Sequence, residues 1–131
     1  MSHCNRILVI EDNADLADLV REVLEAEGFD VCIALTPDEG LARFVDLRPA
    51  LVLLDLHLPG RSPLELIAQL RRKAASPTRI VAMTGGDESP SGVHAILRKP
   101  FDLNLLVEAA TAAERAAASA RQSELLTVDR L

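Results

Sequence analysis

The chain has 131 residues, 49% of them hydrophobic and 26% charged, which is typical of one globular domain with its own core. Its 14 basic and 20 acidic side chains give a net charge of −6, a sign that offers no general attraction to nucleic acid or to an anionic membrane. Two cysteines are too few for a disulfide framework, and the sequence contains no signal-like segment and no long apolar run. We therefore expect a cytoplasmic protein that binds neither nucleic acid nor membrane.

Five short apolar runs alternate with amphipathic stretches along the chain. The runs are mostly continuous rather than alternating in polarity, which is the pattern of strands buried on both faces of a parallel sheet. We expect strands at residues 7–10, 31–35, 51–54, 80–83 and 94–97.

Helix start and stop signals lie between these runs. Gly28 is placed to end a first helix, and "TPDE" (36–39) and "SPLE" (62–65) have the form of capping boxes with proline at the first helical position. Asp102 is the expected cap of a last helix.

This alternation of strands and helices predicts an α/β fold, a flavodoxin-like doubly wound parallel sheet of five strands in the order 2-1-3-4-5. We expect one domain over residues 1–120. Residues 121–131 are expected to extend the last helix or to fray.

Polar residues follow the expected strands where the carboxyl ends of a parallel sheet meet at one edge. Glu11 and Asp12 follow the first strand, Asp55 the third, Thr84 the fourth and Lys99 the fifth. Taken alone, Asp55 could simply open a solvated turn, and the first two acids could be an N-terminal acid pair of a helix. Together they predict a crowded negative site with one lysine opposite.

Such crowding has an energetic consequence. Two carboxylates about 5 Å apart repel each other by roughly 3 kcal/mol at an effective dielectric constant near 20. Either protons or a cation must offset this cost, and an all-oxygen set of ligands suits Mg²⁺. A metal-neutralised Asp55 is then a candidate nucleophile toward a phosphoryl group, whose oxygens Lys99 and the Thr84 hydroxyl would contact.

Four motifs carry a family resemblance. They are "VIEDNADLADLV" (9–20), "LVLLDLHLPG" (51–60), "AMTGG" (82–86) and "LRKPFD" (97–102). In this order, at these strand ends, they resemble the response-regulator receiver domain of two-component signalling over roughly residues 5 to 120.

The resemblance implies a role for each acid at the sheet edge. Asp55 would be the phosphoacceptor, charged from the phosphohistidine of a histidine kinase or phosphotransfer protein. Mg²⁺ would be held by Glu11, Asp12 and Asp55 together with the backbone carbonyl of His57. The protein would accept, and slowly hydrolyse, its own phosphoryl group rather than act on an external substrate.

The resemblance also assigns roles at the ends of the fourth and fifth strands. Thr84 would be the switch hydroxyl, Lys99 would contact the phosphoryl group, and Pro100 would match the cis-proline turn of the family.

Three features depart from the family pattern. Ile96 stands where an aromatic ring usually reports phosphorylation. Residues 85–93 are rich in glycine, serine and proline, so we expect the fourth helix to be missing or reduced to a turn, with one short helical turn at 87–91 as the alternative. His57 is either a solvated loop residue or, as a hypothesis, alters hydrolysis of the acyl phosphate.

Our interpretation is a stand-alone receiver whose phosphorylation changes its binding to a downstream protein, or which passes the phosphoryl group on. The alternative is a non-phosphorylated module for constitutive docking, which the altered fourth helix and Ile96 favour. A nucleotide or FMN site is disfavoured, because "EDNAD" places acids where an anion-binding loop would be needed.

Overall fold

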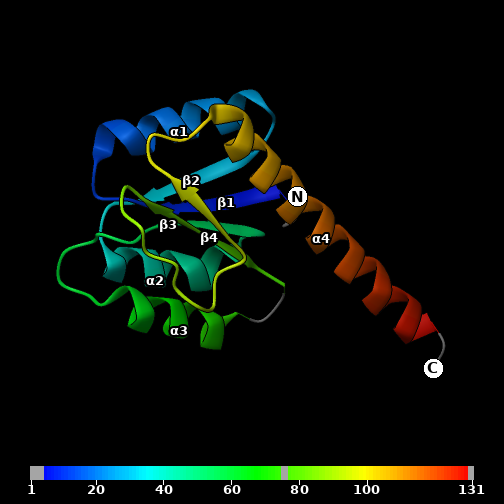
Figure 1. Ribbon diagram of the computed structural model, residues 1–131. Coiled ribbons are helices and arrows are strands. Elements are labelled where there is room, and N and C mark those ends of the chain that lie inside the picture. The colour runs from blue at the N-terminus through cyan, green and yellow to red at the C-terminus, as the bar shows by residue number, and fades with distance from the viewer. Residues whose placement is uncertain (1–4, 75–76, 130–131) are drawn as a thin grey trace.

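The computed structural model describes residues 5–74 and 77–129, with side chains described through residue 122. Strands and helices alternate along the described chain as far as the fourth strand, which leads to the fifth without a helix (Figure 1). In order, the elements are β1 (Arg6–Ile10), α1 (Ala14–Ala26), β2 (Asp30–Ala34), α2 (Pro37–Leu47), β3 (Leu51–Asp55), α3 (Pro63–Lys73), β4 (Arg79–Thr84), β5 (Ala95–Arg98) and α4 (Leu103–Asp129).

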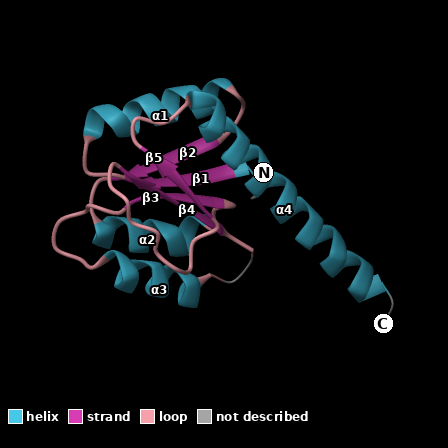
Figure 2. Ribbon diagram, viewed as in Figure 1, coloured by secondary structure: helices cyan, strands magenta, loops and turns pink. Residues whose placement is uncertain are grey.

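The strands form one parallel sheet in the order β2-β1-β3-β4-β5, which confirms the predicted topology. Figure 2 shows α1 and the start of α4 on one face of the sheet, with α2 and α3 on the other. Every residue of the central strand β3 is buried, because helices cover both of its faces. This double coverage explains why the strand sequences are continuous apolar runs.

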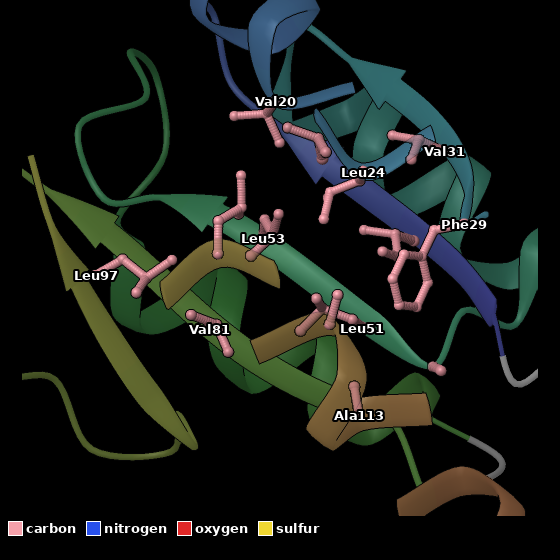
Figure 3. Packing of buried hydrophobic residues seen from close by; sticks show 14 of the residues in the cluster. Val20, Leu24, Phe29, Val31, Leu51, Leu53, Val81, Leu97 and Ala113 are labelled. Carbon is pink, nitrogen blue, oxygen red and sulfur yellow. The ribbon is translucent and has the colours of Figure 1, made fainter. Parts of the chain in front are cut away.

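Two apolar cores lie on opposite faces of the sheet. In the first, Val20 and Leu24 of α1 and Ala113 of α4 pack against Leu51 and Leu53 of β3 (Figure 3). In the second, the intervening strand residues pack against α2 and α3. The sheet is therefore fixed from both sides, and its carboxyl edge is held in one geometry.

The capping predictions have mixed outcomes. Gly28, with φ +93°, follows the end of α1, and Thr36 accepts a hydrogen bond from the amide of Glu39 at 3.1 Å, both as predicted. Asp102 caps α4 by accepting from the amide of Asn104 at 2.8 Å. The capping box at Ser62 was wrong, because its side chain makes no cap hydrogen bond; Pro63, whose ring presets a helical φ, begins this helix without one.

Two residues predicted to lie in strands fall just outside them. Leu35 lies outside β2 and is 42% exposed, and His94 lies just before β5. The imidazole of His94 takes the place of a backbone acceptor, since its Nδ1 accepts the amide of Ile80 at 2.9 Å. At this position a side-chain nitrogen therefore accepts the hydrogen bond that a backbone carbonyl of the neighbouring strand accepts elsewhere in the sheet.

The connection between β4 and β5 contains no helix, as predicted. Residues 85–94, all of them described, form bends and one turn at residues 91–92, and the short helical turn considered at 87–91 is absent. Arg71 of α3 donates to the carbonyl of Gly92 at 3.0 Å, which fixes the far end of this connection. Because β4 and β5 are parallel, this segment returns the chain from the carboxyl end of β4 to the start of β5 past α3, without a helix.

Helix α4 runs through Asp129 and projects beyond the sheet, as Figure 1 shows. Ala110, Ala113 and Ala117 are buried on its packed face, where small side chains allow close approach to the sheet and α1. Within the described residues, we find no helix that is both long and apolar enough to span a membrane.

Candidate functional site

The acidic residues predicted to converge do so at the carboxyl edge of the sheet. Strands β1 and β3 are neighbours with Ile10 opposite Leu54, so the residues that follow this pair, Glu11 and Asp55, lie side by side. One carboxylate oxygen from each of Glu11, Asp12 and Asp55 lies within 4.8 Å of the others. Glu11 and Asp55 are buried and Asp12 is exposed, which leaves the cluster open to solvent on one side.

Lys99 approaches this cluster from the end of β5. Its Nζ lies 2.8 Å from Oε1 of Glu11 and 3.6 Å from Oδ1 of Asp55. The peptide bond between Lys99 and Pro100 is cis, as the family pattern implied, and the Lys99 amide donates to the carbonyl of Thr84. The ammonium therefore faces two of the three acids.

Backbone amides fix the two buried carboxylates. The amide of His57 donates to Oδ1 of Asp55 at 3.0 Å, and the amide of Asn13 donates to Oε2 of Glu11 at 3.1 Å. Each acid is thus held by the turn that follows its own strand, and both carboxylates are aimed at the same space.

The charges at this edge perturb one another. Burial raises the pKa of Glu11, although the hydrogen bond from Lys99 opposes the shift. Desolvation disfavours the charge of Lys99, but its hydrogen bond to Glu11 and the charge of Asp55 outweigh that cost, so the pKa of Lys99 is raised. Lys99 thus contacts two of the three acids, and an added cation would relieve the repulsion that remains in the cluster.

Thr84, the last residue of β4, is fully buried, but its hydroxyl is not free. Oγ1 of Thr84 donates to Oε1 of Glu88 at 2.7 Å and accepts from the amide of Gly86 at 3.0 Å. Nε2 of His57 lies 3.2 Å from the same hydroxyl oxygen and 2.9 Å from Oε2 of Glu88. The hydroxyl predicted to serve a phosphoryl group is therefore bonded to a carboxylate.

Glu88 is the residue that the sequence interpretation missed. The hydrogen bond from Thr84 lowers the pKa of Glu88, so this carboxylate is ionised at neutral pH. Arg98 holds the surrounding loop, since it donates to the carbonyls of Gly86 and Glu88 at 2.6 and 3.0 Å. The sequence did contain a signal for this contact. Glu88 follows Thr84 by only four residues, so the short loop keeps its carboxylate near the end of β4.

His57 is half-exposed yet engaged, so the reading of a purely solvated loop histidine was wrong. Its suggested effect on acyl-phosphate hydrolysis stays a prediction. Ile96 is partly buried in the second core, and no aromatic ring stands at its position.

The family model that describes the response regulator receiver domain matches residues 7–111. The chain belongs to this family. The receiver is 37% identical over 109 residues to the DNA-binding response regulator MtrA of Mycobacterium tuberculosis, a match that covers 78% of this chain and 47% of MtrA. It is 32% identical over 101 residues to the transcriptional regulatory protein ResD of Bacillus subtilis, covering 73% of this chain and 42% of ResD. This receiver spans about half the length of the curated relatives it matches.

Solved structures show the same fold. A CheY-like response regulator receiver domain protein from Methanospirillum hungatei superimposes with a TM-score of 0.80 at 26% identity, covering 88% of this chain and 97% of that one. NtrX from Brucella abortus gives a TM-score of 0.80 at 28% identity, covering 92% of this chain and 29% of NtrX.

The acidic cluster of this receiver fits a divalent cation. Its donors are hard oxygens, they lie within 4.8 Å of one another, and the exposed Asp12 leaves a path for a hydrated ion. Mg²⁺ keeps several of its waters rather than binding in an all-protein cage, so an acidic cluster with one side open to solvent suits it. Receivers typically use this ion.

Proposed function

We propose that Asp55 is the phosphoacceptor of this receiver and that Mg²⁺ assists its phosphorylation. The observation that carries the proposal is the position of Lys99, whose ammonium lies 3.6 Å from Asp55 and 2.8 Å from Glu11. The transfer of a charged phosphoryl group requires positive charge around the nucleophile. Lys99 would supply it on one side, and a cation held by the acidic cluster would supply it on the other.

In the proposed reaction an oxygen of Asp55 attacks the phosphorus of a phosphohistidine. The N–P bond breaks, its electron pair stays on the imidazole nitrogen, and that nitrogen takes a proton from solvent. Bound Mg²⁺ would neutralise charge on the carboxylate and phosphoryl oxygens. Glu11, Asp12 and Asp55 would hold the ion with the backbone carbonyl of His57.

Two residues of this chain would contact the transferred group. The ammonium of Lys99 would donate a hydrogen bond to one phosphoryl oxygen, and the hydroxyl of Thr84 would donate to another. The acceptor carboxylate is kept in place by the His57 amide, so the nucleophilic oxygen is aimed before the donor arrives.

The signal that follows is a change in binding to a downstream protein. MtrA is named a DNA-binding response regulator, and this chain spans 47% of it. For the residues described here we keep the proposal of a protein target rather than DNA, which the net charge of −6 supports.

Intact-mass measurement after incubation with acetyl phosphate and Mg²⁺ tests the proposal. Wild type and an Asp46→Asn control, altered at an exposed acid of α2, should each gain one phosphoryl group, and Asp55→Asn should gain none. No gain in wild type would instead favour a constitutive docking module, the reading supported by Ile96 and the missing helix.

A further inference from the structure

The Thr84 hydroxyl has one proton to donate, and it donates it in a hydrogen bond to the carboxylate of Glu88. The 2.7 Å bond from Thr84 to a charged acceptor is short and charge-assisted, which makes it stronger than a neutral hydrogen bond. The remaining lone pairs of the hydroxyl oxygen face the Gly86 amide and Nε2 of His57. The hydroxyl therefore has both an acceptor, Glu88, and a donor, the Gly86 amide, in the form described.

Under the proposed function, the same hydroxyl has to donate to a phosphoryl oxygen on Asp55. One proton cannot serve two anionic acceptors at full strength. The carboxylate of Glu88 and a phosphoryl group near Thr84 would also repel each other, because both are negative and both lie at the same sheet edge. Phosphorylation therefore sets two acceptors in competition for one donor.

We propose that Glu88 is a positioning residue that holds the Thr84 hydroxyl away from Asp55. Phosphorylation replaces Glu88 by a phosphoryl oxygen as the acceptor of this hydroxyl, and it thereby detaches the loop at residues 85–93 from Thr84 and His57. The inference rests on the proposed function and deepens it. The loop, rather than an aromatic ring at position 96, then reports phosphorylation to a protein partner.

The contacts of the loop explain why this one exchange matters. Within residues 85–93, Glu88 supplies the side chain that binds the phosphorylation edge, through Thr84 and His57. The other anchors are Arg98, which lies opposite Thr84 at the end of β5, and Arg71 of α3. Loss of the Glu88 side-chain contacts would detach the loop from Thr84 and His57, while Arg98 and Arg71 keep its backbone beside β5 and α3.

The test measures the rate at which acetyl phosphate and Mg²⁺ phosphorylate Asp55. In this reaction Asp55 attacks phosphorus, the bond between phosphorus and the acetate oxygen breaks, and acetate leaves. Glu88→Ala should be phosphorylated about fivefold faster than wild type, the factor expected for removal of one competing hydrogen bond. Asp87→Ala is the matched control, since it removes an exposed acid from the neighbouring position, and it should stay within about twofold of wild type.

A conservative variant separates the hydrogen bond from the charge. Glu88→Gln keeps a carbonyl oxygen that can accept from Thr84 but loses the negative charge. Its rate should return toward that of wild type if the hydrogen bond is the restraint. A rate equal to that of Glu88→Ala, matched by an equally fast Asp87→Ala, would instead assign the effect to general charge and overturn the inference.

The rate of amide hydrogen exchange at Gly86 is a second measurement. It reports the orientation of the Thr84 hydroxyl rather than the rate of phosphoryl transfer. The Gly86 amide donates to the Thr84 hydroxyl, so rotation of that hydroxyl toward a phosphoryl group removes its acceptor. In wild type and Asp87→Ala, sustained phosphorylation should speed this exchange about tenfold, the effect of weakening one backbone bond by roughly the energy of a hydrogen bond. In Glu88→Ala the change should be much smaller, because the hydroxyl is already free to rotate.

The outcomes separate the two proposals. Equal phosphorylation rates in all variants, with no change in Gly86 exchange, would overturn the role of Glu88 and leave Asp55 as the acceptor. No phosphoryl gain in any of them would overturn the proposed function itself and the inference with it. Urea unfolding midpoints that match wild type would establish that the exposed-loop variants are folded.

Discussion

Lys99 and Glu11, 88 residues apart in the chain, form an ion pair of 2.8 Å at the carboxyl edge of the sheet. The Glu11 side chain is only 1% exposed, so its charge has little help from solvent. Lys99 follows β5, and Glu11 follows β1, with β3 and β4 lying between these strands. The pair therefore depends on the whole sheet being assembled in its observed order.

Replacing Lys99 with methionine should destabilise the protein. The change leaves two buried carboxylates without their cation, and removing one partner of a buried ion pair costs about 3–5 kcal/mol. Urea denaturation at pH 7.5 should show this loss of unfolding free energy. Lys73→Met, altered at an exposed residue at the end of α3, should change it by less than about 0.5 kcal/mol. Equal effects of the two changes would contradict the structural role of the ion pair.

Magnesium should stabilise the wild-type protein through the acidic cluster. A ligand that binds only the folded state adds about 2.7 kcal/mol when its concentration is a hundred times its dissociation constant. Asp12→Asn should lose most of this effect, because it removes the exposed carboxylate from the set of three. Thermal unfolding with and without MgCl₂ measures the difference. Asp46→Asn should keep the full shift; a shift retained in Asp12→Asn would remove this acid from the metal site.

His94 should make stability depend on pH. Burial, together with the positive charges of Arg79 and Arg71, lowers the pKa of His94 below its usual 6.5. The unfolded chain therefore takes up the proton first, so the contribution of His94 is complete above pH 6.5 and is lost as the pH falls through the lower folded-state pKa. A protonated Nδ1 also cannot accept the Ile80 amide.

The difference in unfolding free energy between wild type and His94→Ala measures this contribution. It should be largest at pH 8 and should shrink by pH 5.5. A difference that is the same at both pH values would show that the neutral imidazole is not what supports β5.

Gly40 lies where α2 crosses β1, and a side chain there should be destabilising. A Cβ at this position would lie 2.6 Å from Cδ1 of Ile10, which is itself fully buried and cannot move into solvent. Gly40→Ala should therefore cost about 1–3 kcal/mol, the range for overpacking, despite the better helix propensity of alanine. The double change with Ile10→Val, which removes Cδ1, should recover part of the loss.

Urea denaturation checks this prediction. Gly85→Ala is its control, because nothing lies within 4 Å of the corresponding Cβ. An equally stable Gly40→Ala would mean that α2 can move away from the sheet at little cost.

Much of this protein was readable from local patterns in the sequence. Continuous apolar runs separated by capped helices indicate a parallel sheet, and such a sheet brings its carboxyl ends together without further information. Glu11, Asp55 and Lys99 could therefore be placed at one edge from their positions in the chain alone. The missing helix was readable as well, because nine residues rich in glycine, serine and proline have neither the length nor the periodicity for one.

The tertiary structure alone decided how the side chains at that edge are paired. No periodicity governs the loop that carries Glu88, so its bond to Thr84 depends on anchors such as Arg98, which follow only once β5 lies beside β4. His94, predicted only as part of the strand at residues 94–97, became an acceptor for the Ile80 amide for the same reason. Strand patterning sets which backbone ends meet, whereas hydrogen-bond partners are chosen among all groups that the folded chain brings within reach.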